Sequence, residues 1–543
     1  MREPTPTAPA RRSVPARRSA PARRSAPVRR SAPVRVDQLL AHGAPESPAL
    51  TFRDETVGYA ELAERVARVA GGLRALGVAR GDRVAVHAEK RIETVVALLA
   101  ASAAGAVFVP INPLYKERQL RGVIENCAPR VLITTAERRG AVTAALPERA
   151  PVAHVVAIGT DAWHRLASAE PDPGDADVID QDPAAILYTS GSTGGPKGVV
   201  LSHRNLLAGA ESVAGYLRHT PDDVILAALP LSFDAGFSQL TTSLIAGAHL
   251  VLVNYLGPRD IVRLCARHRV TALTCVPPLW LRLAEQDWPD EATSALRYFA
   301  NTGGRMPRAT LAALRRTFPN AEPFLMYGLT EAFRSTYLDP AQVDRRPDSI
   351  GKAIPNAEIL LVRSDGTPCE PGEHGELVHR GALVALGYWG DPERTAERFR
   401  PVPGAPPTGR PELAVWSGDT AYRDQDGYLY FVGRDDDMIK TSGYRVSPTE
   451  VEEAAYATGL VAEAVALGVP DERLGQEVVL AFTPRHPGLT VPQLSRALAH
   501  ELPAYMLPRR FEALTALPRS VNGKFDRVEL RRTVRRTSQE PAC

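Results

Sequence analysis

The sequence predicts an α/β protein with a large N-terminal domain of layered, mostly parallel sheets and helices, followed by a small α+β C-terminal domain. From about Val36, helical periodicity alternates with short β-branched runs, which is the pattern of parallel strands covered by helices. Near residues 419–434 the pattern changes to a glycine-turned hairpin, and a shorter α+β segment follows. The chain has 543 residues, which is too long for one ordinary core.

The large domain opens with an amphipathic helix at residues 61–78, and a second helical pattern covers residues 201–217. Eight short apolar runs are expected to be strands: 82–88, 106–111, 130–135, 152–158, 184–189, 223–230, 249–253 and 272–276. The uncharged run Thr94–Ile111 is long enough to suggest a membrane span, but it is rich in alanine and contains Gly105 and Pro110. We expect a buried helix leading into a buried strand there, and neither a transmembrane segment nor a signal peptide.

The C-terminal segment begins after the hairpin that we expect at residues 421–434. A helix should start with Ser447 as its N-cap, Pro448 at the first helical position and Glu450 at the third. We therefore predict a large domain at residues 36–433 and a small domain at residues 434–543.

Residues 1–35 form an arginine-, proline-, serine- and alanine-rich hexapeptide repeat, with no apolar face that could be buried. We expect this tail to be disordered. It holds ten arginines and one glutamate, which is +9, and the whole chain carries +3, so the rest of the chain carries −6. A mildly acidic body argues against a nucleic-acid partner. Contact between the basic tail and an acidic partner stays open, beside the alternative of a dispensable tail.

Five cysteines are scattered along the chain with neither metal-ligand nor paired spacing, which is typical of a reducing, cytoplasmic compartment. Among the 65 basic Lys and Arg residues, six are lysines: Lys90, Lys116, Lys197, Lys352, Lys440 and Lys524. In a chain that favours arginine, a lysine is a candidate for chemistry that needs a compact point charge.

The segment YTSGSTGGPKGVVLSHRN, residues 188–205, joins a predicted strand to a predicted helix. Its glycines allow backbone N–H groups to approach an anion closely, and its hydroxyls and Lys197 add donors and charge. It is not the common nucleotide P-loop, because Lys197 follows Pro196 and precedes Gly198. The pattern favours a phosphate cradle over a flexible surface loop.

Five motifs in order resemble the adenylate-forming superfamily of acyl-CoA synthetases, peptide-synthetase adenylation domains and luciferases. They are YTSGSTGGPKGVVLSH, YGLTEA at 327–332, WSGDTAYRDQDGYLYFVGR at 416–434, DDMIKTSGYRV at 436–446 and LPRSVNGKFDR at 517–527. The resemblance covers about residues 36–530. It makes residues 36–433 an AMP-binding domain, and it implies that a carboxylate attacks the α-phosphate of ATP to give acyl-AMP and pyrophosphate.

The resemblance implies a nucleotide site with Mg²⁺. The β- and γ-phosphates would be held by Thr189, Ser190, Gly191, Ser192, Thr193, Gly194, Gly195 and Lys197. Thr330 would contact the α-phosphate and Glu331 would hold the metal, a hard cation that prefers carboxylate oxygen. The remaining nucleotide contacts would come from Gly303, Gly304, Tyr327, Gly328, Asp419 and Arg434, with Asp419 on the ribose hydroxyls.

Lys524 would lie between the substrate carboxylate and the α-phosphate, two groups of like charge that must approach each other. In the family the small domain is mobile and turns after adenylation. Lys524 then leaves, and a face with Lys440 and Gly443 enters for transfer to the thiol of CoA or of carrier-protein phosphopantetheine. The hinge position matches Asp436, within residues 434–437.

The acyl pocket implied by the resemblance includes Asp234, Ser238, Cys275, Thr302, Met326 and Arg334. In amino-acid-activating members an aspartate follows phenylalanine where Phe233 and Asp234 stand here, and it pairs with the α-amine. Arg334 could hold a second substrate carboxylate, or it could pair with Asp234 and leave the pocket neutral.

The function we rank first is an AMP-forming acyl-CoA ligase of fatty-acid or natural-product metabolism. The alternative is a stand-alone enzyme that adenylates an amino acid or diacid and loads a carrier protein. A non-catalytic relative would be expected to lack Lys524, Glu331 or Lys197, and all three are present.

Overall fold

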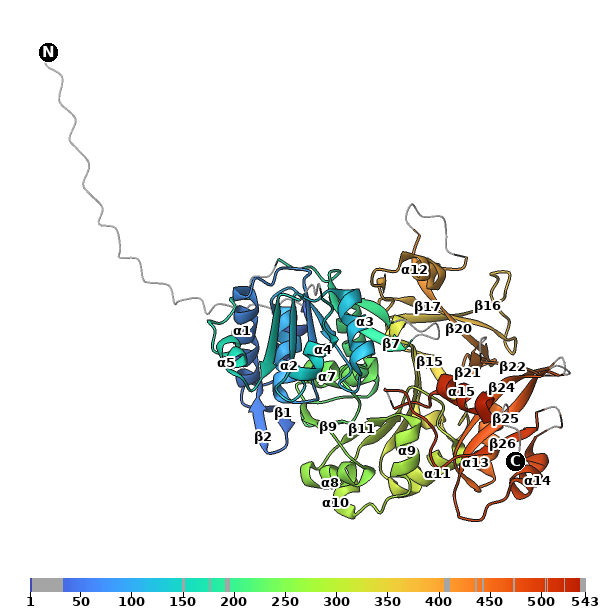
Figure 1. Cartoon of the computed structure of the whole chain (residues 1–543). Helices are drawn as coiled ribbons and strands as arrows, with labels where there is room; N and C mark the ends of the chain where they lie inside the picture. Colours follow the sequence, from blue (N-terminus) through green and yellow to red (C-terminus); the bar gives the residue numbers. More distant parts are fainter. Residues whose placement is uncertain are drawn as a thin grey trace. The chain divides into compact units, whose positions relative to one another are not determined.

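The computed structural model describes residues 1, 33–148, 152–174, 177–190, 196–404, 411–434, 437–441, 444–471, 474–502, 504, 506–521 and 523–537. One compact unit, Val34–Cys543, is distinct from Met1–Pro33. It combines a large N-terminal domain of layered sheets and helices with a smaller C-terminal domain, which confirms the predicted fold class (Figure 1).

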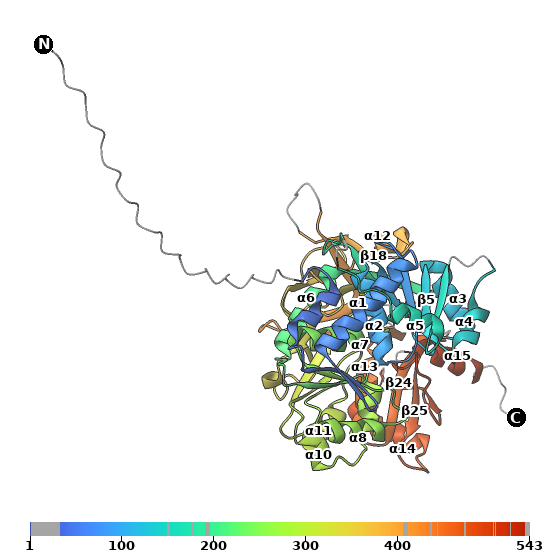
Figure 2. The ribbon, with the colours of Figure 1, turned by 90° about the vertical axis from the view of Figure 1, so that its left-hand side faces the viewer.

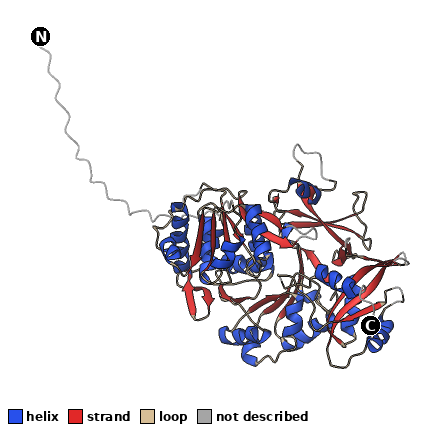
Figure 3. Ribbon diagram, viewed as in Figure 1, coloured by secondary structure: helices blue, strands red, loops and turns tan. Residues whose placement is uncertain are grey.

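The first sheet of the large domain has, in the described part of the chain, the strand order β18-β8-β7-β4-β3-β5-β6. Its strands are β3 (Arg83–His87), β4 (Val107–Pro110), β5 (Val131–Thr135), β6 (His154–Ile158), β7 (Pro183–Ser190), β8 (Pro196–Ser202) and β18 (Gly387–Tyr388). The five strands from β7 to β6 in this order run parallel, and β8 is antiparallel to β7. Helices lie on both sides of these strands (Figure 3).

The second sheet has the order β16-β17-β20-β21-β15-β14-β13-β12-β11-β9-β10-β1-β2, and β19 pairs with β20. One half contains β1 (Pro48–Phe52), β2 (Glu55–Gly58), β9 (Val224–Ala227), β10 (His249–Leu252), β11 (Ala272–Cys275), β12 (Tyr298–Asn301) and β13 (Glu322–Tyr327). The other half contains β14 (Thr336–Leu338), β15 (Ser349–Ala353), β16 (Ala357–Val362), β17 (Gly375–Gly381), β19 (Phe399–Pro401), β20 (Leu413–Arg423) and β21 (Leu429–Arg434). The strands from β1 through β10, β9, β11 and β12 to β13 are parallel, and those beyond β13 are antiparallel.

The helices of the large domain cover these sheets, with α1 against α2 and α6 against α7. In Figure 2, α1 and α2 lie to the left of β5, and α3 and α4 lie to its right. The helices are η1 (Val36–His42), α1 (Tyr59–Ala75), α2 (Ile92–Ala103), α3 (Glu117–Cys127), α4 (Arg139–Ala145), α5 (Asp161–Ala167), α6 (His203–Tyr216), α7 (Asp234–Ala246), α8 (Pro258–His268), α9 (Pro277–Leu283), α10 (Asp290–Thr293), α11 (Arg308–Thr317), η2 (Thr330–Ala332), η3 (Pro340–Gln342) and α12 (Pro392–Arg398).

The alanine-rich run after residue 91 forms the buried helix and strand that its composition predicts. In α2 every residue except Glu93 is buried, and the helix leads into the fully buried β4. No helix among the described residues is long and apolar enough to cross a membrane.

The segment from Pro196 to Ser202 differs from its prediction. A loop was expected to lead directly into a helix, but these residues form β8, which pairs with β7 in a hairpin before α6 begins at His203. Val199, Val200 and Leu201 are buried, so apolar burial favours a strand here despite the neighbouring glycines.

The small domain consists of β22 (Ile439–Thr441), β23 (Tyr444–Val446), α13 (Pro448–Ala457), β24 (Val461–Asp471), β25 (Gly475–Pro484), α14 (Val491–Glu501), β26 (Arg510–Ala513) and α15 (Arg527–Thr537). Its sheet has the order β23-β22-β25-β24, with β26 beside β25. Helix α13 begins where the sequence predicts, but the Ser447 hydroxyl does not cap it and instead donates to the Val432 carbonyl. Leu281 of α9 belongs to the apolar core of this domain and thereby joins it to the large domain.

A buried histidine at the start of α6 makes the stability of the large domain depend on pH. The ring of His203 accepts a hydrogen bond at Nδ1 from the Val36 N–H, at 3.2 Å, and burial lowers the pKa of His203 to about 4.

We predict that His203→Gln reduces the loss of stability on acidification. The unfolded chain, with a histidine pKa of about 6.5, binds this proton more readily than the folded protein does. The stabilisation is therefore present above pH 6.5 and is lost as the pH falls towards 4. The free energy of unfolding, measured with urea, should fall between pH 7 and pH 5 by about 2 kcal/mol less in the variant than in the wild type. The exposed His42, changed to Gln, is the control, and equal losses in both variants would contradict the prediction.

Candidate active site

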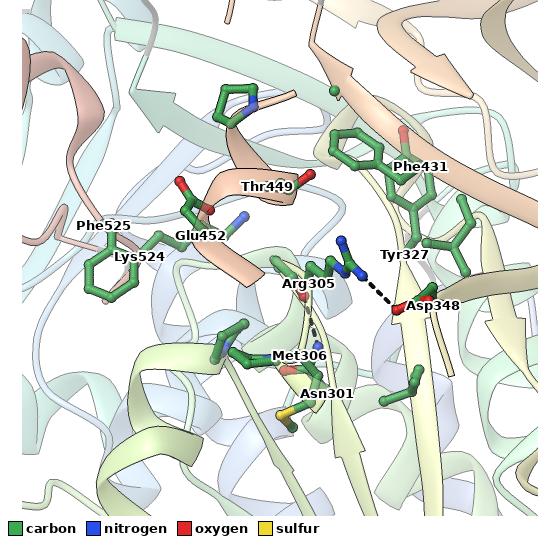
Figure 4. A pocket seen from close by; sticks show the side chains of 18 of the residues that line it. Asn301, Arg305, Met306, Tyr327, Asp348, Phe431, Thr449, Glu452, Lys524 and Phe525 are labelled. Carbon is green, nitrogen blue, oxygen red and sulfur yellow. Dashed lines mark hydrogen bonds and ion pairs between the residues drawn. The ribbon is translucent and has the colours of Figure 1, made fainter. Parts of the chain in front are cut away.

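A cavity of about 390 Å³ lies where the small domain meets the carboxyl ends of the large domain's parallel strands. Its lining includes Gly303, Gly304, Met326, Tyr327, Gly328 and Asp419 from the large domain and Lys524 from the small domain. In Figure 4, Lys524, Phe525 and Glu452 lie opposite Tyr327 and Asp348. The cavity thus brings together seven residues that the family resemblance implies for the nucleotide and acyl sites.

Lys524 is presented by a tight turn of the small domain. The Ser520 N–H donates to the Lys524 carbonyl at 2.7 Å, the Gly523 N–H donates to the Ser520 carbonyl at 2.9 Å, and Gly523 has a φ of +78°. Gly523 supplies the left-handed conformation that this turn requires.

The lysine side chain crosses the face of Gly303 in the large domain. A Cβ atom added at Gly303 would lie 2.8 Å from Cε of Lys524, and Gly303 itself has a φ of +77°. The Lys524 ammonium lies 5.0 Å from the centre of the Phe233 ring, which is within cation–π distance. Glycine at position 303 therefore leaves room for the Lys524 side chain to enter the cavity.

Asp419 lies on β20 and is 3% exposed. The Tyr327 hydroxyl donates to its Oδ2 at 2.5 Å, and the Ser417 hydroxyl accepts a hydrogen bond from its N–H at 3.1 Å. Arg434 is the cross-strand neighbour of Asp419 in the β20–β21 pairing. A buried carboxylate held in this way presents acceptor oxygens to the cavity that it lines.

A second group lies outside the described lining of this cavity and is centred on Tyr388 of β18. The Tyr388 hydroxyl donates to Oε1 of Glu331 at 2.6 Å, and the ammonium of Lys197 lies 4.8 Å from the Tyr388 ring centre. Burial raises the pKa of Tyr388, and the charge of Glu331 raises it further, so the phenol stays a donor. Thr330, next to Glu331, is also buried. Lys197 stands on β8 opposite Thr189 of β7.

Asp234 and Arg334 form a buried ion pair. Nη1 of Arg334 lies 3.4 Å from Oδ2 of Asp234, and the side chains are 3% and 5% exposed for Arg334 and Asp234 respectively. Nη1 of Arg334 also donates to the Phe333 carbonyl at 2.8 Å, and Asp234 Oδ1 accepts from the Ala235 N–H at 2.8 Å. Within the described structure Nε of Arg334 has no hydrogen-bond partner.

Arg334 reaches this position because Phe333 has a φ of +56°, a backbone conformation that is strained for a phenylalanine. The Phe333 ring packs against α6 at Gly209, where an added Cβ would lie 2.5 Å from the ring. That packing holds the strained turn.

The remaining residues of the expected acyl pocket are buried in the interior. Ser238 lies on α7, Cys275 ends β11, Thr302 follows β12, and Met326 on β13 accepts a hydrogen bond from the Tyr216 hydroxyl at 2.9 Å. Of these, Met326 alone also lines the described cavity. Burial raises the pKa of the Cys275 thiol well above its usual range, so this cysteine stays a neutral thiol.

Several expected residues lie outside the described residues, namely Gly191, Ser192, Thr193, Gly194, Gly195, Asp436 and Gly443. For Ser190, Arg434 and Lys440 the structure describes the backbone on β7, β21 and β22 only.

The chain matches the family model for AMP-binding enzymes over residues 38–389, and the model for the C-terminal domain of AMP-binding enzymes over residues 450–524. The protein belongs to the AMP-binding enzyme family. These are the adenylate-forming enzymes that the five motifs resemble, so that prediction is confirmed.

AMP-binding relatives of two kinds are similar to this chain. Two proteins of the linear gramicidin synthase of Brevibacillus parabrevis are 32% and 31% identical to it over 90% of the chain, and feruloyl-CoA synthase of Amycolatopsis sp is 33% identical over 91%. The chain spans only 6% and 9% of the two gramicidin synthase proteins, but 97% of feruloyl-CoA synthase. ATP-bound MatB from Rhodopseudomonas palustris matches with a TM-score of 0.84 and 28% identity, over 93% of this chain and 99% of that one.

Sequence reasoning gave no contact for four residues of this AMP-binding enzyme, which are Asn112, Phe233, Tyr388 and the buried Lys90. Their partners are distant in sequence, as with Tyr388 and Glu331, which are 57 residues apart. For Lys90 the scarcity of lysine in the chain was a signal in the sequence. In the structure its ammonium donates to the Ala227, Ala228 and Leu229 carbonyls at 2.6–3.1 Å.

We predict that Arg334→Met destabilises the protein by about 3–5 kcal/mol, because it leaves the Asp234 carboxylate buried without its cation. The double variant Asp234→Leu/Arg334→Met should recover part of that loss, since no buried charge remains. Urea unfolding measures both. The exposed pair Arg218–Glu322 provides the control, where Arg218→Met should cost less than about 1 kcal/mol. If Arg334→Met lowers the free energy of unfolding no more than Arg218→Met does, the Asp234–Arg334 pair is not a buried ion pair.

Proposed function

We propose that this protein is an AMP-forming acid–thiol ligase that activates a carboxylic acid with ATP and transfers it to a thiol, with CoA as the first choice. The observation that carries the proposal is the Lys524 ammonium, which comes from the small domain into the same cavity as Asp419, Tyr327 and Gly303. The family of the chain supports the adenylation step, and the full-length match to feruloyl-CoA synthase supports the acyl-CoA product.

In the first step the substrate carboxylate attacks the α-phosphorus of ATP. The bond from that phosphorus to the bridging oxygen breaks, so acyl-AMP forms and pyrophosphate leaves. Lys524 neutralises the two approaching anions, and Thr330 contacts the α-phosphate. The segment Thr189–Gly195, with Lys197, takes up the charge of the departing phosphates.

The nucleoside end of ATP is held by hydrogen bonds and close backbone contact. Asp419, already oriented by the Tyr327 hydroxyl, accepts the ribose hydroxyls, and Arg434 assists from the neighbouring strand. Gly303, Gly304 and Gly328 have no side chains of their own, so the adenine can approach their backbone closely.

Glu331 is the residue that would hold Mg²⁺. Among the described residues no group of three or more His, Cys, Asp or Glu side chains could form a protein-only metal cage. A single protein carboxylate, that of Glu331, fits Mg²⁺, which is commonly bound by one or two carboxylates together with substrate phosphates. The Tyr388 hydroxyl at 2.6 Å orients the Glu331 carboxylate. When bound, the ion neutralises phosphate charge.

In the second step the small domain, residues 434–543, turns about Asp436 relative to the large domain, residues 36–433. Lys524 leaves, and the face with Lys440 and Gly443 receives the thiol, which attacks the acyl carbon and releases AMP. Two incompatible geometries at one cavity give a reason for such a turn.

The buried Asp234–Arg334 pair favours an acid without an α-amine. Asp234 stands where amino-acid-activating members bind that amine, but here the Arg334 guanidinium lies 3.4 Å away and supplies the positive charge. The alternative, loading of a carrier protein with an amino acid or diacid, is supported by the match to the linear gramicidin synthase proteins.

The function is tested by ATP–pyrophosphate exchange over fatty, aromatic, dicarboxylic and amino acids, followed by product analysis with and without CoA. We expect acid-dependent exchange and a CoA thioester. Exchange with an amino acid and no CoA thioester would favour the carrier-loading alternative. Absence of exchange with every acid would contradict the proposal.

We predict that Lys524→Ala lowers acyl-AMP formation by about 10²–10³-fold while supplied acyl-AMP is still converted to thioester. The reason is that the lysine neutralises the reacting anions in the first step only. Single-turnover assays of each half-reaction measure the two rates separately. The exposed Lys352, changed to Ala, serves as the control because it lies outside the cavity lining. Near-normal pyrophosphate release by Lys524→Ala would remove the lysine from this role.

A further inference from the structure

We propose that Asn112 is a positioning residue for Lys524: its side chain fixes the lysine-bearing turn to the large domain during adenylation and releases it for thiol transfer. This inference rests on the proposed function. Asn112 lies outside the five motifs on which the resemblance rests, and it lies two residues after the end of β4.

Hydrogen bonds at both ends orient the carboxamide of Asn112. Its Oδ1 accepts from the Leu114 N–H at 2.9 Å, and its Nδ2 donates to the Val521 carbonyl in the small domain, also at 2.9 Å. Asn112 is 3% exposed, so water competes little for these bonds. The first bond identifies which end of the carboxamide is oxygen and thereby directs the N–H donor at Val521.

The two ends of this contact are both firmly held. On one side β4 lies inside the parallel sheet, between β7 and β3. On the other side Val521 belongs to the turn closed by the Ser520–Lys524 hydrogen bond and by the Asp526 N–H, which donates to the Pro518 carbonyl at 2.9 Å. Because the turn is closed, fixing the Val521 carbonyl also fixes the backbone of Lys524 three residues later.

The strength of the contact suits a temporary attachment. One neutral hydrogen bond changes the balance between two states by only a few-fold to about tenfold, so it biases the small domain without locking it. Two polar contacts between the domains, among the described residues, lie farther along the chain from Lys524. The Arg308 N–H donates to Oε1 of Glu453 at 3.0 Å, and Arg485 lies 3.9 Å from Glu285. The Asn112 side chain, in contrast, forms its hydrogen bond with the backbone of the lysine-bearing turn.

The substitution Asn112→Asp tests the proposal with minimal change of shape. Aspartate keeps an acceptor for the Leu114 N–H, but it has no N–H donor and places a carboxylate against the Val521 carbonyl. We expect acyl-AMP formation, followed with the most active acid of the exchange screen, to fall by about 10-fold or more. Thioester formation from supplied acyl-AMP should stay within about twofold of the wild type, because the turn has left the cavity in that step.

Hydrogen exchange of the full chain with ATP and Mg²⁺ provides a readout that needs no acid. Peptides covering residues 518–526 should exchange faster in Asn112→Asp than in the wild type. The matched control is Asn254→Asp, because Asn254 also donates to a backbone carbonyl, that of Lys90 at 2.8 Å, but within the large domain. In Asn254→Asp the rates of acyl-AMP formation and of thioester formation should change by the same factor. Hydrogen exchange at residues 518–526 should stay as in the wild type.

The outcomes distinguish this inference from the proposed function. If the wild type is active, then equal loss of both half-reactions in Asn112→Asp, or unchanged exchange at 518–526, overturns the role of Asn112. Absence of acid-dependent pyrophosphate exchange in the wild type overturns the proposed function instead, while faster hydrogen exchange at 518–526 would still establish the attachment.

Discussion

A lysine ammonium carried by one domain can stay in a cavity of another only if its path is clear and its backbone is held. Both conditions are met around Lys524. The path is clear because residue 303 is glycine, whose missing Cβ would otherwise lie 2.8 Å from Cε of the lysine. The backbone is held by the hydrogen bond from Asn112 to the Val521 carbonyl. Inside the cavity the Lys524 ammonium forms a cation–π contact with the Phe233 ring, which is an attraction of modest strength. Each contact is weak alone, which is compatible with the proposed turn of the small domain.

The Phe233 ring depends in turn on a second lysine that takes no part in the proposed chemistry. Lys90 follows β3 of the first sheet, and its ammonium donates to three successive carbonyls at the end of β9 in the second sheet. Burial lowers the pKa of Lys90 to about 7, and only the protonated amine has the three N–H groups needed to donate to all three carbonyls. Lys90 thereby joins the two sheets at their carboxyl ends and fixes the start of the segment that leads to Phe233. Replacing these bonds with an apolar side chain would leave several carbonyls buried and unpaired, which is costly.

Local patterns predicted eight strands and several helices of the large domain, because strands of parallel sheets are short apolar runs and these helices show clear periodicity. All eight expected strand runs contain a strand, from β3 at residues 83–87 to β11 at residues 272–275. The hairpin strand β8 was missed because glycine and proline beside Lys197 resemble a loop, while burial of Val199–Leu201 depends on tertiary contacts. The resemblance named seven residues that line the described cavity, but not Asn112, whose partner lies 409 residues away. A side chain that acts across two domains leaves no periodic signal in the sequence.

In the proposed function, the Asp234–Arg334 pair connects the fold to the choice of acid. The strained backbone of Phe333 directs Arg334 inward, and the packing of the Phe333 ring against Gly209 holds that strain. Once inside, the guanidinium needs a carboxylate, and Asp234 provides one through a single 3.4 Å contact. An ammonium group on the substrate would meet a carboxylate already paired, and a second substrate carboxylate would have to displace Asp234. An uncharged acyl group disturbs neither partner. On electrostatic grounds, therefore, a pocket beside this pair is best suited to acids whose only charge is the carboxylate that reacts.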